Sequence, residues 1–195
     1  MTKSDLTGAV LAGGDSRRMG RDKAELLLDG EPLWRRQLRL LHEAGADPVG
    51  VVRRPDQPAL ALPAATPLWH DAVASAGPLA GLHAALAACA TERLAVVATD
   101  MPRLDAGWFH WLRDACRRDT GAVARHADGT FEPLAAIYPR AALAIVMQRL
   151  AAGPHSLQPL AEALVAQGLL VSVPLAASEA WRAASWNTPA DAGPR

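Results

Sequence analysis

The sequence predicts an α/β fold, in which residues 1–195 form a single three-layer α/β/α domain with a mostly parallel sheet and one or two antiparallel strands. Short apolar segments alternate along the chain with segments of helical periodicity, and this alternation is typical of parallel strands between two layers of helices. A hairpin-like stretch around Asp128-Gly129 predicts the antiparallel part. The length of 195 residues suits one domain with one sizeable core.

In the first half of the chain, apolar runs indicate strands and spaced apolar positions indicate a helix. Gly8–Leu11 is a short apolar run and is expected to be the first strand. Leu33–Ala44 repeats apolar residues at helical spacing and stops at Gly45, a residue typical of helix ends. Pro48–Val52 is expected to be the second strand. The proline-rich stretch after it leaves room for no more than a short strand near Leu68-Trp69.

The second half begins with an alanine-rich helix that opens at Gly77 and runs to about Ala90. Leu94–Ala98 is a continuous apolar run and predicts a buried strand. Asp105 is a candidate N-cap for a helix that reaches about Arg117. The remaining expected strands are Ala122–Arg125, Phe131–Tyr138 and Leu169–Val173, and the remaining expected helices are Pro139–Leu150 and Leu157–Gln167.

Composition excludes several classes of function. Twenty basic residues balance twenty acidic ones, which argues against a broadly basic nucleic-acid-binding surface or a polybasic membrane surface. No apolar stretch approaches the roughly 18 residues that a membrane-spanning helix needs, and the apolar run after the first residues is too short for a signal peptide. Cys89 and Cys116 form no CxxC pair and are expected to be buried thiols of a cytoplasmic protein.

The strongest functional signal is the glycine-rich loop that follows the first strand, with the sequence LAGGDSRRMGRDK from Leu11 to Lys23. Gly13 and Gly14 let the backbone turn tightly and approach a ligand closely. Successive backbone N–H groups in such a loop form an anion-binding concavity, and Arg17 and Lys23 add positive charge around it. Lys23 is also one of only two lysines among the twenty basic residues. A triphosphate fits this description.

The loop matches neither of two well-known phosphate-binding patterns. The dinucleotide fingerprint GxGxxG is absent, and the spacing of Gly14, Gly20 and Lys23 differs from GxxxxGK[ST]. In a parallel sheet, ligands bind beyond the carboxyl ends of the strands. This rule brings the loop, the end of the second strand near Arg53, and Asp100 to one place.

Several motifs together resemble the molybdenum cofactor guanylyltransferase family, which belongs to the nucleotidyltransferases with a Rossmann-like domain. The loop is similar to that family's signature LAGGxSxRMGxDK. The similarity continues over nearly the whole chain, in Gly30–Leu33 (GEPL), His70-Asp71, Gly77–Gly81 (GPLAG), Thr99–Pro102 (TDMP), Glu132–Leu134 (EPL) and Asn187–Asp191 (NTPAD). The loop alone points to nucleotidyltransferases in general, whereas GPLAG and NTPxD favour the guanylyl branch.

The resemblance implies a transfer of GMP from GTP to the terminal phosphate of molybdenum-bound molybdopterin, with release of pyrophosphate. The attacking phosphate oxygen is already ionised, so no general base is required. Catalysis then depends on charge neutralisation and in-line positioning, with Mg²⁺ as cofactor. The implied partners are GTP, molybdenum-bound molybdopterin, cofactor-synthesis proteins and apo-molybdoenzymes, but no nucleic acid and no membrane.

The resemblance also implies a role for each matching residue. Asp100 would hold Mg²⁺, and Lys23 and Arg17 would bind phosphates as further catalytic residues. Asn187 would lie towards the pterin, with Trp186 beside it as a candidate for a pterin contact. The residues implied in GTP binding are Leu11, Ala12, Gly13, Lys23, Asp71 and Asp100. Arg53 is a further candidate for GTP binding, at a position where the family often has asparagine.

Two alternatives stay open from the sequence. One is a transferase of the same fold that uses CTP or activates a sugar phosphate, because base choice depends on backbone contacts that the sequence does not reveal. The other is a non-catalytic nucleotide-binding module. The presence of both Lys23 and Asp100 argues against that module.

Overall fold

The computed structural model describes residues 4–14, 23–71, 77–153 and 155–186. A seven-stranded sheet in the order β5-β4-β1-β6-β8-β7-β9 forms its centre. Only β8 runs antiparallel to its neighbours β6 and β7, and the other strand pairs are parallel, which confirms the predicted sheet. The strands are β1 (Leu6–Leu11), β4 (Val49–Arg53), β5 (Leu68–His70), β6 (Arg93–Ala98), β7 (Gly121–Arg125), β8 (Ala135–Pro139) and β9 (Leu170–Pro174).

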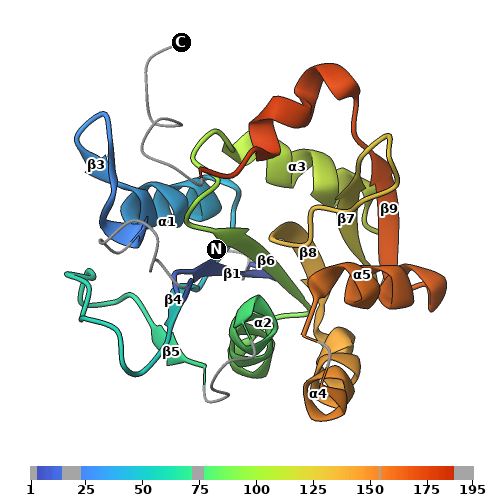
Figure 1. Ribbon diagram of the computed structural model, residues 1–195, viewed down its shortest axis with the longest axis horizontal. Coiled ribbons are helices and arrows are strands. Elements are labelled where there is room, and N and C mark those ends of the chain that lie inside the picture. Colours follow the sequence, from blue (N-terminus) through green and yellow to red (C-terminus); the bar gives the residue numbers. More distant parts are fainter. Residues whose placement is uncertain (1–3, 15–22, 72–76, 154, 187–195) are drawn as a thin grey trace.

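Helices cover both faces of this sheet and complete three layers (Figure 1). One layer contains α1 (Leu33–Glu43) and α3 (Ala106–Ala115). The opposite layer contains α2 (Gly77–Ala88), α4 (Leu143–Ala152) and α5 (Leu157–Ala166). The predicted helices are therefore all present, with ends that differ by a few residues.

The alternation of side chains along the strands divides the hydrophobic core into two parts. Val10 and Val97 face the layer of α1 and α3, whereas Ala9 and Val96 face the layer of α2, α4 and α5. Both parts are built from fully buried aliphatic side chains of the central strands, so β1 and β6 are held rigidly from both sides. This rigidity matters for function because the candidate site lies where these two strands end.

Some element boundaries differ from the prediction. The strand expected from Phe131 begins only at Ala135, because Phe131 forms an isolated bridge with Arg125 and the chain turns before β8. The helix expected from Pro139 begins with a short 3-10 turn, η2 (Arg140–Ala142), which leads into α4. The structure also contains a small hairpin, β2 (Leu27–Leu28) with β3 (Glu31–Pro32), and two further 3-10 segments, η1 (Lys23–Glu25) and η3 (Ala177–Ala183).

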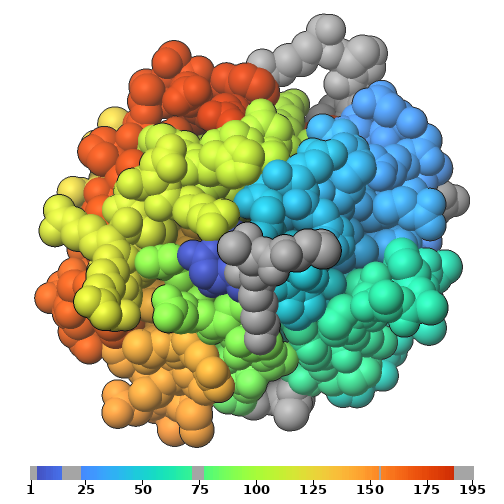
Figure 2. Space-filling model, turned by 180° about the vertical axis from the view of Figure 1, so that it is seen from behind, coloured from blue at the N-terminus to red at the C-terminus, as the bar shows by residue number. Residues whose placement is uncertain are grey.

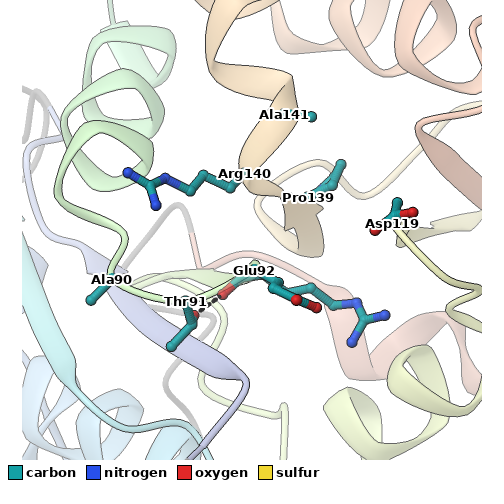
Figure 3. Close-up of a pocket in the computed structure, with 8 residues that line it drawn as sticks. Ala90, Thr91, Glu92, Asp119, Pro139, Arg140 and Ala141 are labelled. Carbon is teal, nitrogen blue, oxygen red and sulfur yellow. Dashed lines mark hydrogen bonds between the residues drawn. The ribbon is translucent and has the colours of Figure 1, made fainter.

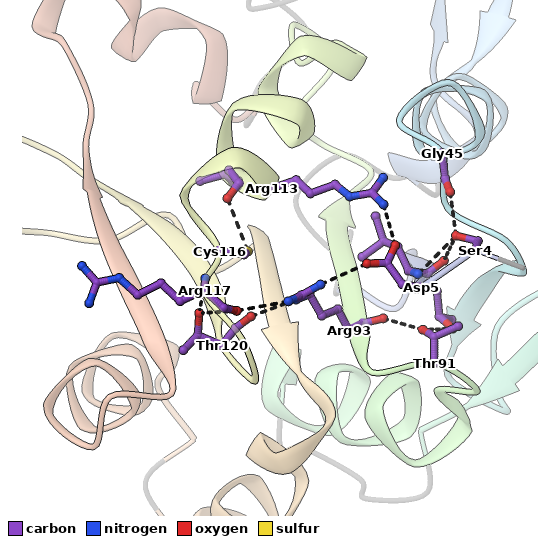
Figure 4. A network of polar contacts seen from close by, with 12 residues as sticks. Ser4, Asp5, Gly45, Thr91, Arg93, Arg113, Cys116, Arg117 and Thr120 are labelled. Atoms are coloured by element: carbon purple, nitrogen blue, oxygen red, sulfur yellow. Dashed lines mark hydrogen bonds and ion pairs between the residues drawn. The ribbon is translucent and has the colours of Figure 1, made fainter. Parts of the chain in front are cut away.

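A polar network ties together the amino-terminal ends of the central strands (Figure 4). Arg93 at the start of β6 lies 3.0 Å from Asp5, just before β1, and Asp5 also pairs with Arg113 of α3. The same guanidinium donates to the carbonyl oxygens of Thr120 and Arg117 ahead of β7. From behind, the dark blue start of the described chain lies at the surface beside the light blue segment that joins α1 to β4 (Figure 2). The network fixes this edge of the sheet, opposite to the carboxyl ends of β1 and β6.

Both cysteines are free thiols, with Cys89 buried and Cys116 half-buried, and burial raises the pKa of the Cys116 thiol. In the described part of the chain, none of the helices has both the length and the apolar character needed to cross a membrane.

Candidate functional site

The carboxyl ends of β4, β1 and β6 lie side by side and bring three predicted site segments together. Leu11 pairs with Val52 on one side and with Ala98 on the other. The pairing continues beyond the strand ends, because the Ala12 amide donates to the Val52 carbonyl over 2.9 Å and the Thr99 amide donates to the Leu11 carbonyl over 3.3 Å. The backbones of the glycine loop and of the segment leading to Asp100 therefore leave the sheet at the same edge.

Gly13 is the point at which the loop meets the segments after β4 and β5. A Cβ atom at Gly13 would lie 3.4 Å from Asp71 Oδ2 and 3.7 Å from Arg54 Cγ. Arg54 Nη1 donates to the Gly13 carbonyl over 3.4 Å, and the Asp71 amide donates to the Arg53 carbonyl over 3.1 Å. A carboxylate and a guanidinium thus flank the backbone of the loop.

The Asp71 carboxyl group is buried, and this burial raises its pKa. The nearby Arg54 guanidinium partly offsets the effect, since a positive charge favours the carboxylate. Asp56 acts in the same direction as burial, and His70 in the same direction as Arg54. Asp71 is therefore a carboxyl group whose charged form carries an energetic cost in the folded protein.

Asp71→Asn is expected to stabilise the protein at neutral pH, by about 0.5–2 kcal/mol, the usual range for removing one such unfavourable feature. A folded-state pKa above the unfolded one makes the Asp71 contribution to stability largest at low pH and smaller as pH rises through the folded pKa. The stability gain should therefore shrink on acidification. Thermal unfolding of both proteins from pH 4 to 8 measures this gain, with Asp114→Asn on α3 as an exposed control. A gain independent of pH would contradict this electrostatic account.

Lys23 and Asp100 form a second contact at this edge of the sheet. Lys23 Nζ lies 3.4 Å from Asp100 Oδ2, and the two side chains are 21% and 24% exposed. Lys23 Nζ also donates to the Trp186 carbonyl over 3.1 Å, while the Trp186 amide donates to the Asp100 carbonyl over 2.7 Å. One ammonium, one carboxylate and the main chain of Trp186 thus form a single cluster at the end of β6.

The segment before Trp186 runs across the carboxyl edge of the sheet and is anchored at several points (Figure 1). It starts at Leu175, whose amide donates to the Arg125 carbonyl over 2.8 Å. In η3, Arg182 lies 2.8 Å from Asp105 and 5.6 Å from the Trp108 ring. These contacts place the main chain of Trp186 at the site, although it is far from Asp100 in the sequence.

The structure places the sequence-predicted residues as follows. Leu11 and Ala12 are buried at the end of β1, and Arg53 is only 2% exposed at the end of β4. Arg17 and Asn187 lie outside the described residues. The structure brings together two groups at the same sheet edge, Gly13 with Asp71 and Lys23 with Asp100.

Two contributors to this site were not predicted, or not in the role that the structure gives them. Arg54, which was not predicted, donates to the Gly13 carbonyl of the loop. Trp186 acts through its main-chain groups, and its side chain is only 6% exposed, whereas the sequence had made it a candidate for a pterin contact. The contact of Arg54 could have been found by predicting that β4 extends to Arg53, which makes Arg54 the first residue beyond the strand. The contacts of Trp186 use its main-chain groups, so no side-chain pattern in the sequence indicates them.

Asp100 is suited to a hard cation such as Mg²⁺, which prefers oxygen ligands and commonly retains water and phosphate oxygens. In the part of the chain that the structure describes, no three His, Cys, Asp or Glu side chains gather where they could hold a metal ion. Asp100 therefore fits Mg²⁺ that also takes ligands from a polyphosphate.

A separate pocket of about 380 Å³ lies at the opposite edge of the sheet (Figure 3). It is lined by the segment before β6, including Thr91 and Glu92, and by Asp119 and Arg140. Acidic and basic side chains alternate around it, and Arg93 on its wall is engaged in the network of Figure 4. This pocket is far from the cluster at Asp100.

Comparisons with known proteins agree with the fold. Residues 8–169 match the model of the MobA-like NTP transferase domain. The chain is 54% identical over 191 residues to a probable molybdenum cofactor guanylyltransferase of Opitutus terrae, covering 96% of this chain and 93% of that protein. A protein of Deinococcus radiodurans with the same description is 36% identical over 159 residues, covering 78% and 77% of the two chains.

Solved structures show the same architecture. A molybdopterin-guanine dinucleotide biosynthesis protein A from Archaeoglobus fulgidus superposes with a TM-score of 0.70 at 24% identity, covering 95% of this chain and 94% of that one. A 2-C-methyl-D-erythritol 4-phosphate cytidylyltransferase from Thermus thermophilus gives a TM-score of 0.67 at 16% identity, covering 94% of each chain. At these identities the likeness concerns the fold alone, which proteins named for different substrates share.

Proposed function

Because the chain belongs to the MobA-like NTP transferase family and is a nucleotidyltransferase, we propose that it is a molybdenum cofactor guanylyltransferase. In the proposed reaction, a terminal phosphate oxygen of molybdenum-bound molybdopterin attacks the α-phosphorus of GTP. The bond between the α-phosphorus and the bridging oxygen to the β-phosphate breaks. The products are the guanine dinucleotide form of the cofactor and pyrophosphate, so the atoms balance without a further reactant.

The observation that carries this proposal is the meeting of the glycine loop, Lys23 and Asp100 at one edge of the sheet. Backbone N–H groups of a glycine loop and one ammonium suit a chain of phosphates. A carboxylate at the end of a buried strand suits the cation that accompanies them. The high identity to relatives described as probable guanylyltransferases supports the same assignment.

The proposed transfer requires that the charges of the substrates are neutralised and that the reacting groups are aligned. Both substrates are anionic, the leaving group is anionic, and the nucleophile is ionised at neutral pH, so no residue needs to remove a proton. Lys23 would bind phosphate oxygens and reduce the repulsion between the reactants. Asp100 would hold Mg²⁺, which supplies further neutralisation of phosphate charge when bound. Arg17 would add positive charge on the same side.

Nucleotide recognition would use the other half of the site. Leu11, Ala12 and Gly13 offer backbone groups, and the Gly13 position leaves the approach open because it has no side chain. Asp71 beside Gly13 is an acceptor for donor groups of a guanine base or a ribose. Arg53, at the end of β4, is proposed as a further nucleotide-binding residue. Asn187 is proposed on the pterin side, next to Trp186.

The proposed setting is the cytoplasm, with cofactor-synthesis proteins supplying the molybdenum-bound pterin and apo-molybdoenzymes receiving the product. A nucleotide panel tests the base assignment, since selective stabilisation of the folded protein reports affinity. With Mg²⁺ present, GTP is expected to raise the melting temperature more than CTP, ATP or UTP. Pyrophosphate release is expected only with GTP, Mg²⁺ and molybdenum-bound molybdopterin together.

Other outcomes of that panel identify the alternatives. Better turnover with CTP would replace the guanylyl assignment by a cytidylyl one, for which the shared fold of the Thermus thermophilus cytidylyltransferase is a precedent. Turnover with a sugar phosphate would identify a different acceptor. Nucleotide binding without any transfer would identify a non-catalytic module.

A further inference from the structure

We propose that Lys23 occupies the cation position at Asp100 while no nucleotide is bound, and that nucleotide binding moves this ammonium from Asp100 to the phosphates. The divalent cation and the nucleotide would then enter the site together, and the C-terminal segment at Trp186 would respond to their entry. This inference rests on the proposed function, because it assigns the phosphates to Lys23 and the divalent cation to Asp100.

The geometry of the cluster is the first step. Lys23 is proposed to bind phosphates and Asp100 to bind a divalent cation. The two side chains contact each other directly, with 3.4 Å between Lys23 Nζ and Asp100 Oδ2. In the structure, the negative charge that would attract a divalent cation is paired with an ammonium. The partial burial of both side chains limits the screening of this pair by water.

Competition follows from this pairing. A divalent cation that approaches Asp100 alone meets the Lys23 ammonium and must displace it or bear its repulsion. Within the described residues, no further cluster of metal-ligating side chains compensates for that cost. A nucleotide changes the balance, since its phosphates give Lys23 new anionic partners and provide the cation with additional oxygen ligands.

The main chain of Trp186 connects this exchange to the C-terminal segment. Lys23 Nζ donates to the Trp186 carbonyl over 3.1 Å, whereas the Trp186 amide is held separately by the Asp100 carbonyl at 2.7 Å. Departure of Lys23 would release the carbonyl and leave the amide bond in place. Trp186 directly precedes Asn187, the residue proposed for the pterin side, in the sequence. The exchange would therefore link nucleotide binding to the binding of the second substrate.

The proposal predicts that loss of Lys23 increases the affinity for a divalent cation, whereas loss of a residue that helps to hold the cation would decrease it. Lys23→Met should bind a divalent cation more tightly than the unsubstituted protein when no nucleotide is present, by about threefold or more for a partly exposed ion pair. The same variant should bind nucleotide more weakly. Titration with Mn²⁺ alone, followed by paramagnetic broadening of amide signals near Asp100 in two-dimensional NMR spectra, measures the cation affinity.

Arg36→Gln is the matched control. Arg36 donates to the Pro102 carbonyl over 2.8 Å, two residues beyond Asp100, so this variant removes a nearby positive charge that is not bonded to the carboxylate. Its Mn²⁺ affinity is expected to stay within about 1.5-fold of the unsubstituted protein, because the half-buried Arg36 guanidinium is bonded to a main-chain carbonyl and screening weakens charges that are not in contact. Equal or weaker Mn²⁺ binding by Lys23→Met would overturn the proposal.

A measurement on the unsubstituted chain makes the test independent of the folding of the variant. Addition of Mg²⁺ with the non-hydrolysable α,β-methylene analogue of GTP is expected to shift the carbonyl ¹³C signal of Trp186, because its hydrogen bond from Lys23 is lost. Binding of the analogue without this shift would overturn the exchange while leaving the proposed function intact. Failure of any nucleotide to bind would instead overturn the proposed function.

Discussion

Replacing Asp100 by asparagine is expected to reduce nucleotidyl transfer by about 10²–10³-fold, which corresponds to the roughly 2.7–4 kcal/mol that one well-placed electrostatic contact supplies in a transition state. Asparagine keeps the size of the side chain and one oxygen, but it removes the negative charge that would hold Mg²⁺. The Trp186 amide bond to the Asp100 carbonyl involves only the main chain and is expected to survive. The rate of pyrophosphate release at saturating GTP, Mg²⁺ and molybdenum-bound molybdopterin measures the effect.

The control for this substitution is Asp114→Asn. Asp114 is an exposed carboxylate on α3, so its loss changes the net charge by the same amount at a distance from the proposed site. Its rate of transfer should match that of the unsubstituted protein. If Asp100→Asn turned over at the same rate as Asp114→Asn, Asp100 would have no role in metal binding during transfer.

The location of Asp100 could be predicted because it depends on one general rule. A buried apolar strand such as Leu94–Ala98 is visible in the sequence, and ligands collect beyond the carboxyl ends of parallel strands. The structure has β6 over Arg93–Ala98, next to β1, as the rule requires. The same reasoning placed the glycine loop correctly, since both segments leave adjacent strands at the same edge.

The predicted end of β4 shows the limit of that rule. The sequence predicted a strand that ends at Val52, which would make Arg53 the first residue beyond the sheet. The strand extends to Arg53, whose side chain is buried, and Arg54 beyond it donates to the Gly13 carbonyl. Because successive side chains in a strand point in opposite directions, an error of one residue at a strand end changes the face on which each side chain is expected.

Two small elements were missed for different physical reasons. The hairpin β2–β3 contains an Asp29-Gly30 turn with positive φ at both residues, 53° and 81°, and this dipeptide is a known hairpin signal. Its strands have only two residues each, too few to show a period of two. The segment η3 has no such local signal, because long-range contacts such as that between Arg182 and Asp105 fix it in place.

Replacing Trp108 by alanine is expected to cost about 3–5 kcal/mol of unfolding free energy, the typical penalty for truncating a fully buried tryptophan. Trp108 has no exposed surface, and its Nε1 donates to the Ala135 carbonyl over 2.9 Å. The variant would leave a cavity between α3 and β8 and an acceptor without this donor. Denaturant unfolding followed by circular dichroism measures the loss.

Two further variants separate the causes of that loss. Trp108→Phe keeps most of the ring volume and removes the N–H donor, so it should cost about 1–3 kcal/mol for the buried acceptor that loses its partner. Trp181→Ala removes an indole that is 49% exposed on η3 and should stay within about 0.5 kcal/mol of the unsubstituted protein. Equal losses for Trp108→Ala and Trp181→Ala would contradict the buried packing of Trp108. A large loss for Trp108→Ala alone is the expected result, because this side chain joins α3 to β8 by packing and by its hydrogen bond to Ala135.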